Sequence, residues 1–223
     1  MFKNLFKSIS HGADIGDESI KFIELIKIGN SFKVNRYGEK KIEEGILEGD
    51  KEKMKETLNS FKKEFKVESV YTFSSIEHKA ETIANVLIKR GDKETYMIVD
   101  LGNKSVGVFI VSNNIVMSSI ILNIRGVEIP DLRDALMKHF IYWHTYKDIE
   151  TKIKPPIKKI ILCGDNDNLE KLAEYFSLGL KTKVELANVW TNILDTSKDI
   201  PEMTREESFK YAGAIAIALE RFK

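Results

Sequence analysis

The sequence is poor in cysteine, in proline and in long apolar runs. It has one cysteine, Cys163, and four prolines among 223 residues. A single cysteine excludes an internal disulfide framework and any zinc cluster built from several cysteines, and it is typical of a reducing compartment. No apolar run approaches the ~18–20 residues of a membrane span, and the N-terminus lacks the long apolar segment of a signal peptide. We therefore expect a cytoplasmic protein.

An excess of charge of either sign is also missing. Lysine and arginine together number 35, and aspartate and glutamate number 34, which gives a net charge of +1. Proteins that bind nucleic acids usually carry a basic excess, so we expect no nucleic-acid partner. Hydrophobic residues make up 43% of the chain and charged residues 31%. This balance is that of an ordinary globular protein rather than a disordered one.

What the sequence does contain is an internal repeat. The segment Asp14–Ile20 (Asp-Ile-Gly-Asp-Glu-Ser-Ile) returns 86 positions later as Asp100–Val106 (Asp-Leu-Gly-Asn-Lys-Ser-Val). Each copy is predicted to form the tight turn between the first two strands of a three-stranded meander. The following strands are expected at residues 19–28 and 32–37 and at 106–111 and 115–122, joined by hairpin turns at Gly29-Asn30 and Asn113-Asn114.

The elements expected after each meander also correspond. The spacing of apolar residues predicts a helix, a strand and a helix at 50–66, 67–73 and 77–89, and again at 126–147, 157–163 and 167–178. A strand at 182–186 and a closing helix at 205–222 follow. The order β-β-β-α-β-α, present twice, predicts an α/β fold of two related halves, each a mixed sheet covered by helices. We expect an N-terminal segment at 1–10, a first half at 11–90 and a second half at 91–223.

The two repeated turns are candidate phosphate-binding sites. Gly16 and Gly102 would let the backbone approach a ligand closely and direct N–H groups at it. The serines that close the turns, Ser19 and Ser105, add hydroxyl donors, and Asn103 and Lys104 belong to the second turn. Two such turns that face each other across a pseudo-twofold axis would clamp a phosphate chain.

Three further sets of residues complete the candidate site. Asp14 and Asp100 end the first strand of each half and are candidates to hold Mg²⁺ through water, because that ion needs few protein carboxylates. Gly164-Asp165 follows a buried strand and precedes a helix whose N-terminus would offer free N–H groups. Glu77, at the start of a predicted helix, is a candidate for positioning a catalytic water.

These segments, in this order, resemble the pattern of the actin, Hsp70 and sugar-kinase superfamily. Its two phosphate motifs resemble residues 14–19 and 100–105, and its adenosine motif resembles residues 162–165. Its two interdomain connectors resemble residues 75–77, with Ala84-Asn85 on the following helix, and residues 211–215. Within the superfamily, the stretches 14–25, 184–190 and 211–219 are similar to the PilM family of type IV pilus assembly.

The resemblance implies an actin-like (ribonuclease H-like) fold, two halves around an interdomain cleft, with ATP and Mg²⁺ in that cleft. It also implies a cytoplasmic scaffold, peripheral to the inner membrane, that grips the short cytoplasmic tail of a PilN-like membrane protein. Such a scaffold would contact other pilus assembly proteins, or those of the related type II secretion machinery, and homo-oligomers are compatible with it. We expect a nucleotide-binding or degenerate scaffold rather than an efficient ATPase.

The sequence departs from the family pattern at two places. PilM proteins carry an inserted subdomain that contributes to the groove for the partner tail, and here the helix at 50–66 leads almost directly to the strand at 67–73. The adenosine motif usually has two adjacent glycines, and here the second is Asp165. A carboxylate at that position adds bulk and negative charge near an anionic ligand. A degenerate scaffold that binds no nucleotide is therefore a competing hypothesis.

Two enzyme classes and a membrane contact also stay open at this point. An ATPase or small kinase would use the same cleft but needs a group that positions or deprotonates the nucleophile. A nuclease of the ribonuclease H type needs several carboxylates at one metal pair in a single half. Asp14 and Glu24 would not suffice, and a duplicated motif is unexpected in that class. The apolar residues of segment 1–10 would lie on one face of a helix, which is either a weak membrane-surface helix or a packed terminus.

Overall fold

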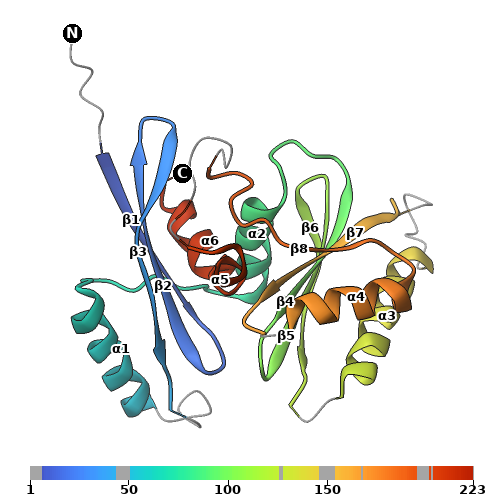
Figure 1. Cartoon of the computed structure of the whole chain (residues 1–223), viewed down its shortest axis with the longest axis horizontal. Helices are drawn as coiled ribbons and strands as arrows, with labels where there is room; N and C mark the ends of the chain where they lie inside the picture. The colour runs from blue at the N-terminus through green and yellow to red at the C-terminus, as the bar shows by residue number, and fades with distance from the viewer. Residues whose placement is uncertain are drawn as a thin grey trace.

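The computed structural model describes residues 7–43, 51–125, 128–145, 154–166, 168–194, 201 and 203–222. Its two β-sheets stand side by side, and two helices, α2 (Ile76–Leu87) and α6 (Ala212–Glu220), lie between them (Figure 1). We call the first sheet with its outer helix the first lobe, and the second sheet with its outer helices the second lobe. The chain therefore forms the two related halves that the repeat predicts.

The first lobe is an antiparallel meander. Its sheet has the order β1-β2-β3, formed by β1 (Lys7–Ile15), β2 (Ser19–Ile28) and β3 (Ser31–Lys41). Helix α1 (Lys51–Phe65) covers the outer face (Figure 1), where Phe61 packs among Ile20 and Phe22. The aromatic rings of Phe22, Phe61 and Phe65 lie 4.7–6.0 Å apart between centroids, so this helix is fixed mainly by aromatic packing.

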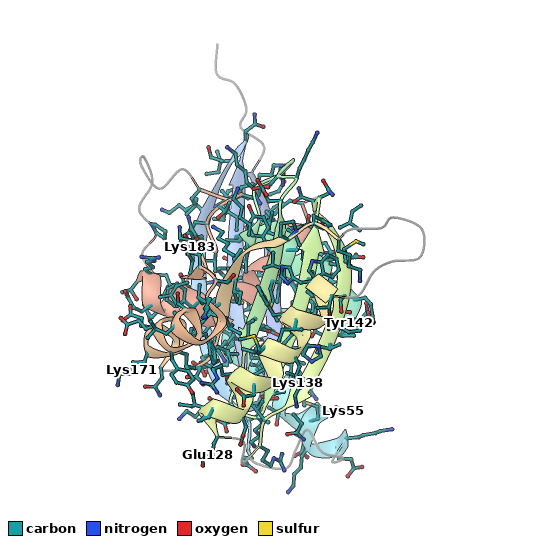
Figure 2. All side chains as sticks on the ribbon, turned by 90° about the vertical axis from the view of Figure 1, so that its right-hand side faces the viewer. Lys55, Glu128, Lys138, Tyr142, Lys171 and Lys183 are labelled. Carbon is teal, nitrogen blue, oxygen red and sulfur yellow. The ribbon has the colours of Figure 1, made fainter. Side chains whose placement is uncertain are left out.

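The second lobe has a mixed sheet in the order β6-β5-β4-β7-β8. Its strands are β4 (Thr95–Leu101), β5 (Ser105–Ser112), β6 (Ile115–Asn123), β7 (Ile157–Gly164) and β8 (Val184–Leu186). The first three form an antiparallel meander, and β7 and β8 add in parallel. Helices α3 (Ile129–Thr145) and α4 (Leu169–Leu180) cover the outer face, and Figure 2 shows them turned toward the viewer, with Lys138 and Tyr142 on α3 and Lys171 on α4.

The hairpin turns that the sequence predicts are confirmed. Asn113 and Asn114 both have positive φ angles, 53° and 60°, which is the backbone of a type I′ turn and matches the twist of the strands that it joins. Gly29 has a φ of 63° in the corresponding hairpin of the first lobe. Each turn sets the register of its hairpin, which then shifts once along the strands, between Glu24 and Leu25 in the first lobe and between Ile110 and Val111 in the second.

A shared core joins the lobes through α2 and α6. Helix α6 reads Ala-Gly-Ala-Ile-Ala-Ile-Ala-Leu-Glu and is buried on all sides except at its last residue, as expected for a helix that is apolar all round. Its small residues allow a very close approach to β1, because a Cβ on Gly12 would lie 1.9 Å from the carbonyl oxygen of Ala214. Helix α2 packs on α6 and on β6 of the second lobe, so the apolar core is continuous between the two sheets.

Two predicted elements differ from the structure. The strand predicted at 67–73 is absent, and a single backbone hydrogen bond of 3.3 Å, from Ala13 N–H to the Tyr71 carbonyl, joins this segment to β1. Only Val67 of its seven residues is buried, so the segment lacks the apolar side chains that would anchor a fourth strand. The closing helix predicted at 205–222 is two helices, α5 (Arg205–Lys210) and α6, which meet at Tyr211.

The N-terminal segment predicted at 1–10 is also partly different, since β1 already begins at Lys7. Residues 1–6 lie outside the described residues. Helix α6, which belongs to the predicted second half, packs on β1 of the first half. The predicted division of the chain into 11–90 and 91–223 is therefore not a division into separately packed units, and it stays a proposal. Among the helices described, none combines the length and the apolar character needed to cross a membrane.

Candidate functional site in the interlobe cleft

The two repeated turns have the same backbone geometry. In the first turn (residues 14–19) the Gly16 N–H donates to the Ser19 carbonyl at 2.9 Å, and in the second turn (residues 100–105) the Gly102 N–H donates to the Ser105 carbonyl, also at 2.9 Å. Asp14 pairs with Lys21 in the β1–β2 register, and Asp100 pairs with Gly107 in the β4–β5 register. The sequence repeat is therefore a structural repeat as well.

The two turns line one cleft of about 350 Å³ between the lobes. The end of β7, the start of α2 and the junction of α5 with α6 complete its walls. Of the residues predicted from sequence, the cleft is lined by Asp14, Gly16, Asp100, Gly102, Asn103, Ser105, Gly164 and Asp165. Ser19 is buried beneath the first turn, and Lys104 lines a neighbouring cavity. Glu77 is exposed and is not brought to the cleft.

Lys79, which the sequence analysis missed, lies between the two repeated aspartates. It extends from the first turns of α2, and its Nζ is 2.7 Å from Asp100 Oδ2. Burial lowers the pKa of Lys79, but the carboxylates of Asp100 and Asp14 outweigh burial and raise the pKa above its ordinary value. Lys79 therefore carries a positive charge at neutral pH.

Asp14 is the more enclosed of the two aspartates. Burial raises the pKa of its carboxyl group, and the Lys79 ammonium offsets this only in part. Helix α6 begins directly against it, because a Cβ on Gly213 would lie 2.1 Å from Asp14 Oδ2. Any larger residue at the start of α6 would displace this carboxylate.

Lys21 is a second basic residue that the sequence analysis missed. It lies on β2 opposite Asp14, is 3% exposed, and forms an ion pair with Asp165 of the predicted adenosine motif. Its Nζ also donates to Ser19 Oγ at 2.6 Å. The sequence signal was present, since Lys21 shares one face of β2 with the apolar residues Ile23 and Leu25. The pair neutralises both charges inside the cleft.

The first turn contacts the second turn directly. Asp17 Oδ2 accepts hydrogen bonds from the backbone N–H groups of Lys104 at 2.9 Å and Ser105 at 3.0 Å. The Ser105 hydroxyl lies 3.1 Å from both carboxylate oxygens of Asp17. Beside this contact, Asn103 Nδ2 donates to Glu18 Oε2 at 2.9 Å. The two turns therefore face each other across the cleft and are bonded to each other, while a phosphate chain held between them stays a prediction.

Comparison with solved structures gives the fold. The chain superposes on a "PilM-PilN type IV pilus biogenesis complex" chain with a TM-score of 0.64 and 12% identity, covering 96% of this chain and 98% of that one. It is also similar to the ethanolamine utilization protein EutJ from Carboxydothermus hydrogenoformans, with a TM-score of 0.59 and 12% identity over 95% and 89% of the two chains. The chain has the actin-like fold.

A third structure of this fold carries a nucleotide. The activator of the 2-hydroxyisocaproyl-CoA dehydratase from Clostridium difficile, solved with bound ADPNP, has a TM-score of 0.52 and 11% identity over 96% of this chain and 94% of that one. The predicted resemblance is thus confirmed for the actin-like fold. No protein-family model matches the sequence, and no curated protein matches it in sequence.

The actin-like fold implies a magnesium nucleotide, and the residues of this cleft do not fit one. The backbone donors of the second turn, which would receive a phosphate, are already taken by Asp17. The Lys79 ammonium lies beside Asp100, where the cation would be held. The cleft lining carries five carboxylates against three lysines, which repels an anionic ligand. Among the described residues, no cluster of three or more His, Cys, Asp or Glu side chains could hold a metal ion.

The nuclease hypothesis also finds no support in the geometry. Glu24 lies on β2 three positions from Lys21, so it points to the opposite face of the sheet from Lys21 and Asp14. Its carboxylate contacts Arg36 Nη2 at 2.5 Å and His11 Nε2 at 2.7 Å. Asp14 and Glu24 are therefore not brought together at one metal pair.

Proposed function

We propose that this chain is an actin-like scaffold of type IV pilus assembly, or of the related type II secretion machinery, that grips the short cytoplasmic tail of a PilN-like membrane protein. On this proposal it is cytoplasmic and peripheral to the inner membrane. The observation that carries the proposal is the likeness to the PilM–PilN complex, because it extends over 96% of this chain and 98% of that chain. The likeness is thus one of the whole architecture rather than of one lobe.

The cleft supports a scaffold rather than an ATPase. An ATPase of this fold needs a metal-bound phosphate chain and a group that positions the attacking water. Here the donors of the second turn are bonded to Asp17, and the one candidate for the water, Glu77, is outside the cleft. Of the ATP-binding and nucleotide-free forms of the scaffold, the geometry favours the nucleotide-free form.

The tail groove of this scaffold differs from that of proteins with an inserted subdomain. Between β3 and α2, the described residues form a single helix, α1, which packs on the first sheet through Phe61 and Phe65. The partner tail therefore binds to a surface built from the two lobes alone. Other pilus assembly proteins and a second copy of this chain remain compatible partners.

The test measures tail binding and turnover on the same preparation. Fluorescently labelled peptides that match the cytoplasmic tails of PilN-like proteins from the same organism are titrated with the purified chain, and anisotropy reports binding. Phosphate release from Mg-ATP is measured in parallel. We expect saturable binding of one tail, no binding of its scrambled version, and no phosphate release. Steady phosphate release without tail binding would contradict the proposal and favour the ATPase.

A further inference from the structure

The two copies of the repeated turn differ in the residues at their tips. The first turn has Asp17 and Glu18, and at the equivalent positions the second turn has Asn103 and Lys104. The acidic tip and the amide-and-amine tip meet across the cleft, because Asp17 accepts from the second turn and Asn103 donates to Glu18. The tips of the two copies are thus complementary to each other in charge and in hydrogen-bonding groups.

The donors that Asp17 occupies form an anion-binding arrangement. Two successive backbone N–H groups, of Lys104 and Ser105, converge with the Ser105 hydroxyl on one carboxylate. Successive N–H groups in a turn bind phosphate and carboxylate oxygens alike, and hydrogen bonds to a charged acceptor are the stronger ones. Gly102 makes room for this anion, since a Cβ at that position would lie 2.8 Å from Asp17 Oδ2.

A cation accompanies the anion. The Lys79 Nζ lies 2.7 Å from Asp100 Oδ2, and the charge of Asp14 also acts on it. The Lys79 ammonium group thus interacts with two carboxylates, Asp14 at the end of β1 and Asp100 at the end of β4, one from each lobe. A divalent cation that bridged these carboxylates would have to displace it.

We propose that the cleft carries its own ligands: the Asp17 carboxylate takes the place of a phosphate group and the Lys79 ammonium takes the place of a divalent cation, so that the lobes are held closed without a nucleotide. A ligand that is part of the chain acts at an effective concentration on the order of millimolar or more. A free nucleotide meets donors that are already satisfied. This inference stands apart from the partner tail, and tail binding can fail while it holds.

The experiment compares thermal unfolding of the wild-type chain with the Asp17→Ala and Glu18→Ala variants, each alone and with millimolar pyrophosphate, Mg-ADP or Mg-ATP. Asp17→Ala empties the anion site and leaves its donors in place. Glu18→Ala is the matched control, because Glu18 is the exposed neighbour and contacts the side chain of Asn103 rather than the backbone donors. A ligand that binds the folded state alone raises the midpoint of unfolding.

We expect no ligand to change the midpoint of the wild-type chain. Asp17→Ala should lower the midpoint by about 5 °C, since it removes charged hydrogen bonds, and pyrophosphate should restore much of this loss. Glu18→Ala should lower the midpoint less, since it removes one exposed hydrogen bond to Asn103, and it should stay insensitive to pyrophosphate. An Asp17→Ala variant that stays insensitive to pyrophosphate would overturn the proposal, because its donors would then not be an anion site.

A second measurement covers the case in which Asp17→Ala does not fold. The wild-type chain is titrated with a fluorescent ATP analogue, with and without Mg²⁺, and the isosteric Asp17→Asn variant is titrated with pyrophosphate. The internal ligand is supported if the ATP analogue does not bind to the wild-type chain and pyrophosphate binds to the Asp17→Asn variant. Binding of the analogue to the wild-type chain with a micromolar Kd overturns it.

Discussion

The first and second turns have the same backbone conformation but take different roles in the contact between the lobes. Each ends a strand with an aspartate and closes with one glycine-to-serine hydrogen bond of 2.9 Å. The second turn presents its backbone N–H groups, whereas the first turn contributes a carboxylate that accepts from them. On our proposal, one copy of a duplicated turn supplies an anion site and the other supplies the anion that fills it, because the tip residues of the two copies differ. Because the two turns differ in this way, substitutions at equivalent positions of the two copies should change stability and ligand binding by different amounts.

The largest effect is expected at Lys79, which lies between the equivalent residues Asp14 and Asp100. Replacing Lys79 by Met keeps the apolar stem and leaves two enclosed carboxylates without their counter-ion. Breaking a buried ion pair in this way costs about 3–5 kcal/mol of unfolding free energy, which denaturant unfolding would measure. Because Mg²⁺ prefers carboxylate oxygens, magnesium should stabilise the Lys79→Met variant and not the wild-type chain. Equal magnesium effects on both would show that the ammonium is not in the cation's place.

The next largest effect concerns Glu24, whose equivalent in the second copy is the buried Ile110. Burial raises the pKa of the Glu24 carboxyl group, but hydrogen bonds from Arg36, Asn35 and His11 outweigh it and lower the pKa to about 2. Since the folded-state pKa lies below the unfolded value near 4.5, the stabilisation is complete above that value. It is lost as the pH falls from about 4.5 to about 2, and it amounts to about 3 kcal/mol at most.

Glu24→Gln isolates this contribution from the other acidic groups. The neutral amide cannot lose a proton, so the variant should be less stable at pH 7 and should show a shallower loss of stability between pH 5 and pH 2. Urea unfolding at a series of pH values provides the comparison. Parallel pH profiles for the wild-type chain and the variant would mean that Glu24 is not held ionised by its neighbours.

The smallest effect compares the two turn glycines directly. A Cβ on Gly102 would lie 2.8 Å from Asp17 Oδ2 and 2.9 Å from the Ser105 carbonyl oxygen, whereas a Cβ on Gly16 would meet only the Ser19 carbonyl oxygen, at 3.5 Å. Gly102→Ala should therefore cost about 1–2 kcal/mol through crowding, and Gly16→Ala should cost little. Calorimetry would measure the unfolding free energy of the two variants. Equal losses of stability would show that Asp17 does not crowd the second turn.

The sequence predicted the elements well because local patterns specify them. Apolar spacing and turn residues such as Asn113-Asn114 fixed the two meanders, and the repeat at Asp14 and Asp100 predicted that two turns share one cleft. The strand expected at 67–73 was wrong because its alternation is not supported by buried apolar side chains. The actin-like fold followed from the order of the motifs, which the superpositions confirm.

The chemistry of the cleft was harder to predict because it depends on how the lobes meet. Asp17 and the N–H groups of Lys104 and Ser105 are far apart in the chain, and nothing local indicates that they bond. In the sequence, Lys79 is indistinguishable from any other lysine of a helix. Its role depends on the position of α2 between the two sheets, which brings its ammonium group to Asp100 in the cleft. Lys21 alone gave a local signal, as a charged residue on the face of β2 that also carries Ile23 and Leu25.

The packing of α6 on β1 has a consequence for biosynthesis. The inner face of the first sheet, which ends at Lys41, is covered by a helix that begins 171 residues later, at Ala212. While the chain emerges from the ribosome, the N-terminal sheet therefore has no cover for that face until Ala212–Glu220 has been made. Proteins usually fold domain by domain from the N-terminus during synthesis, but here the first-made sheet reaches its final packing last.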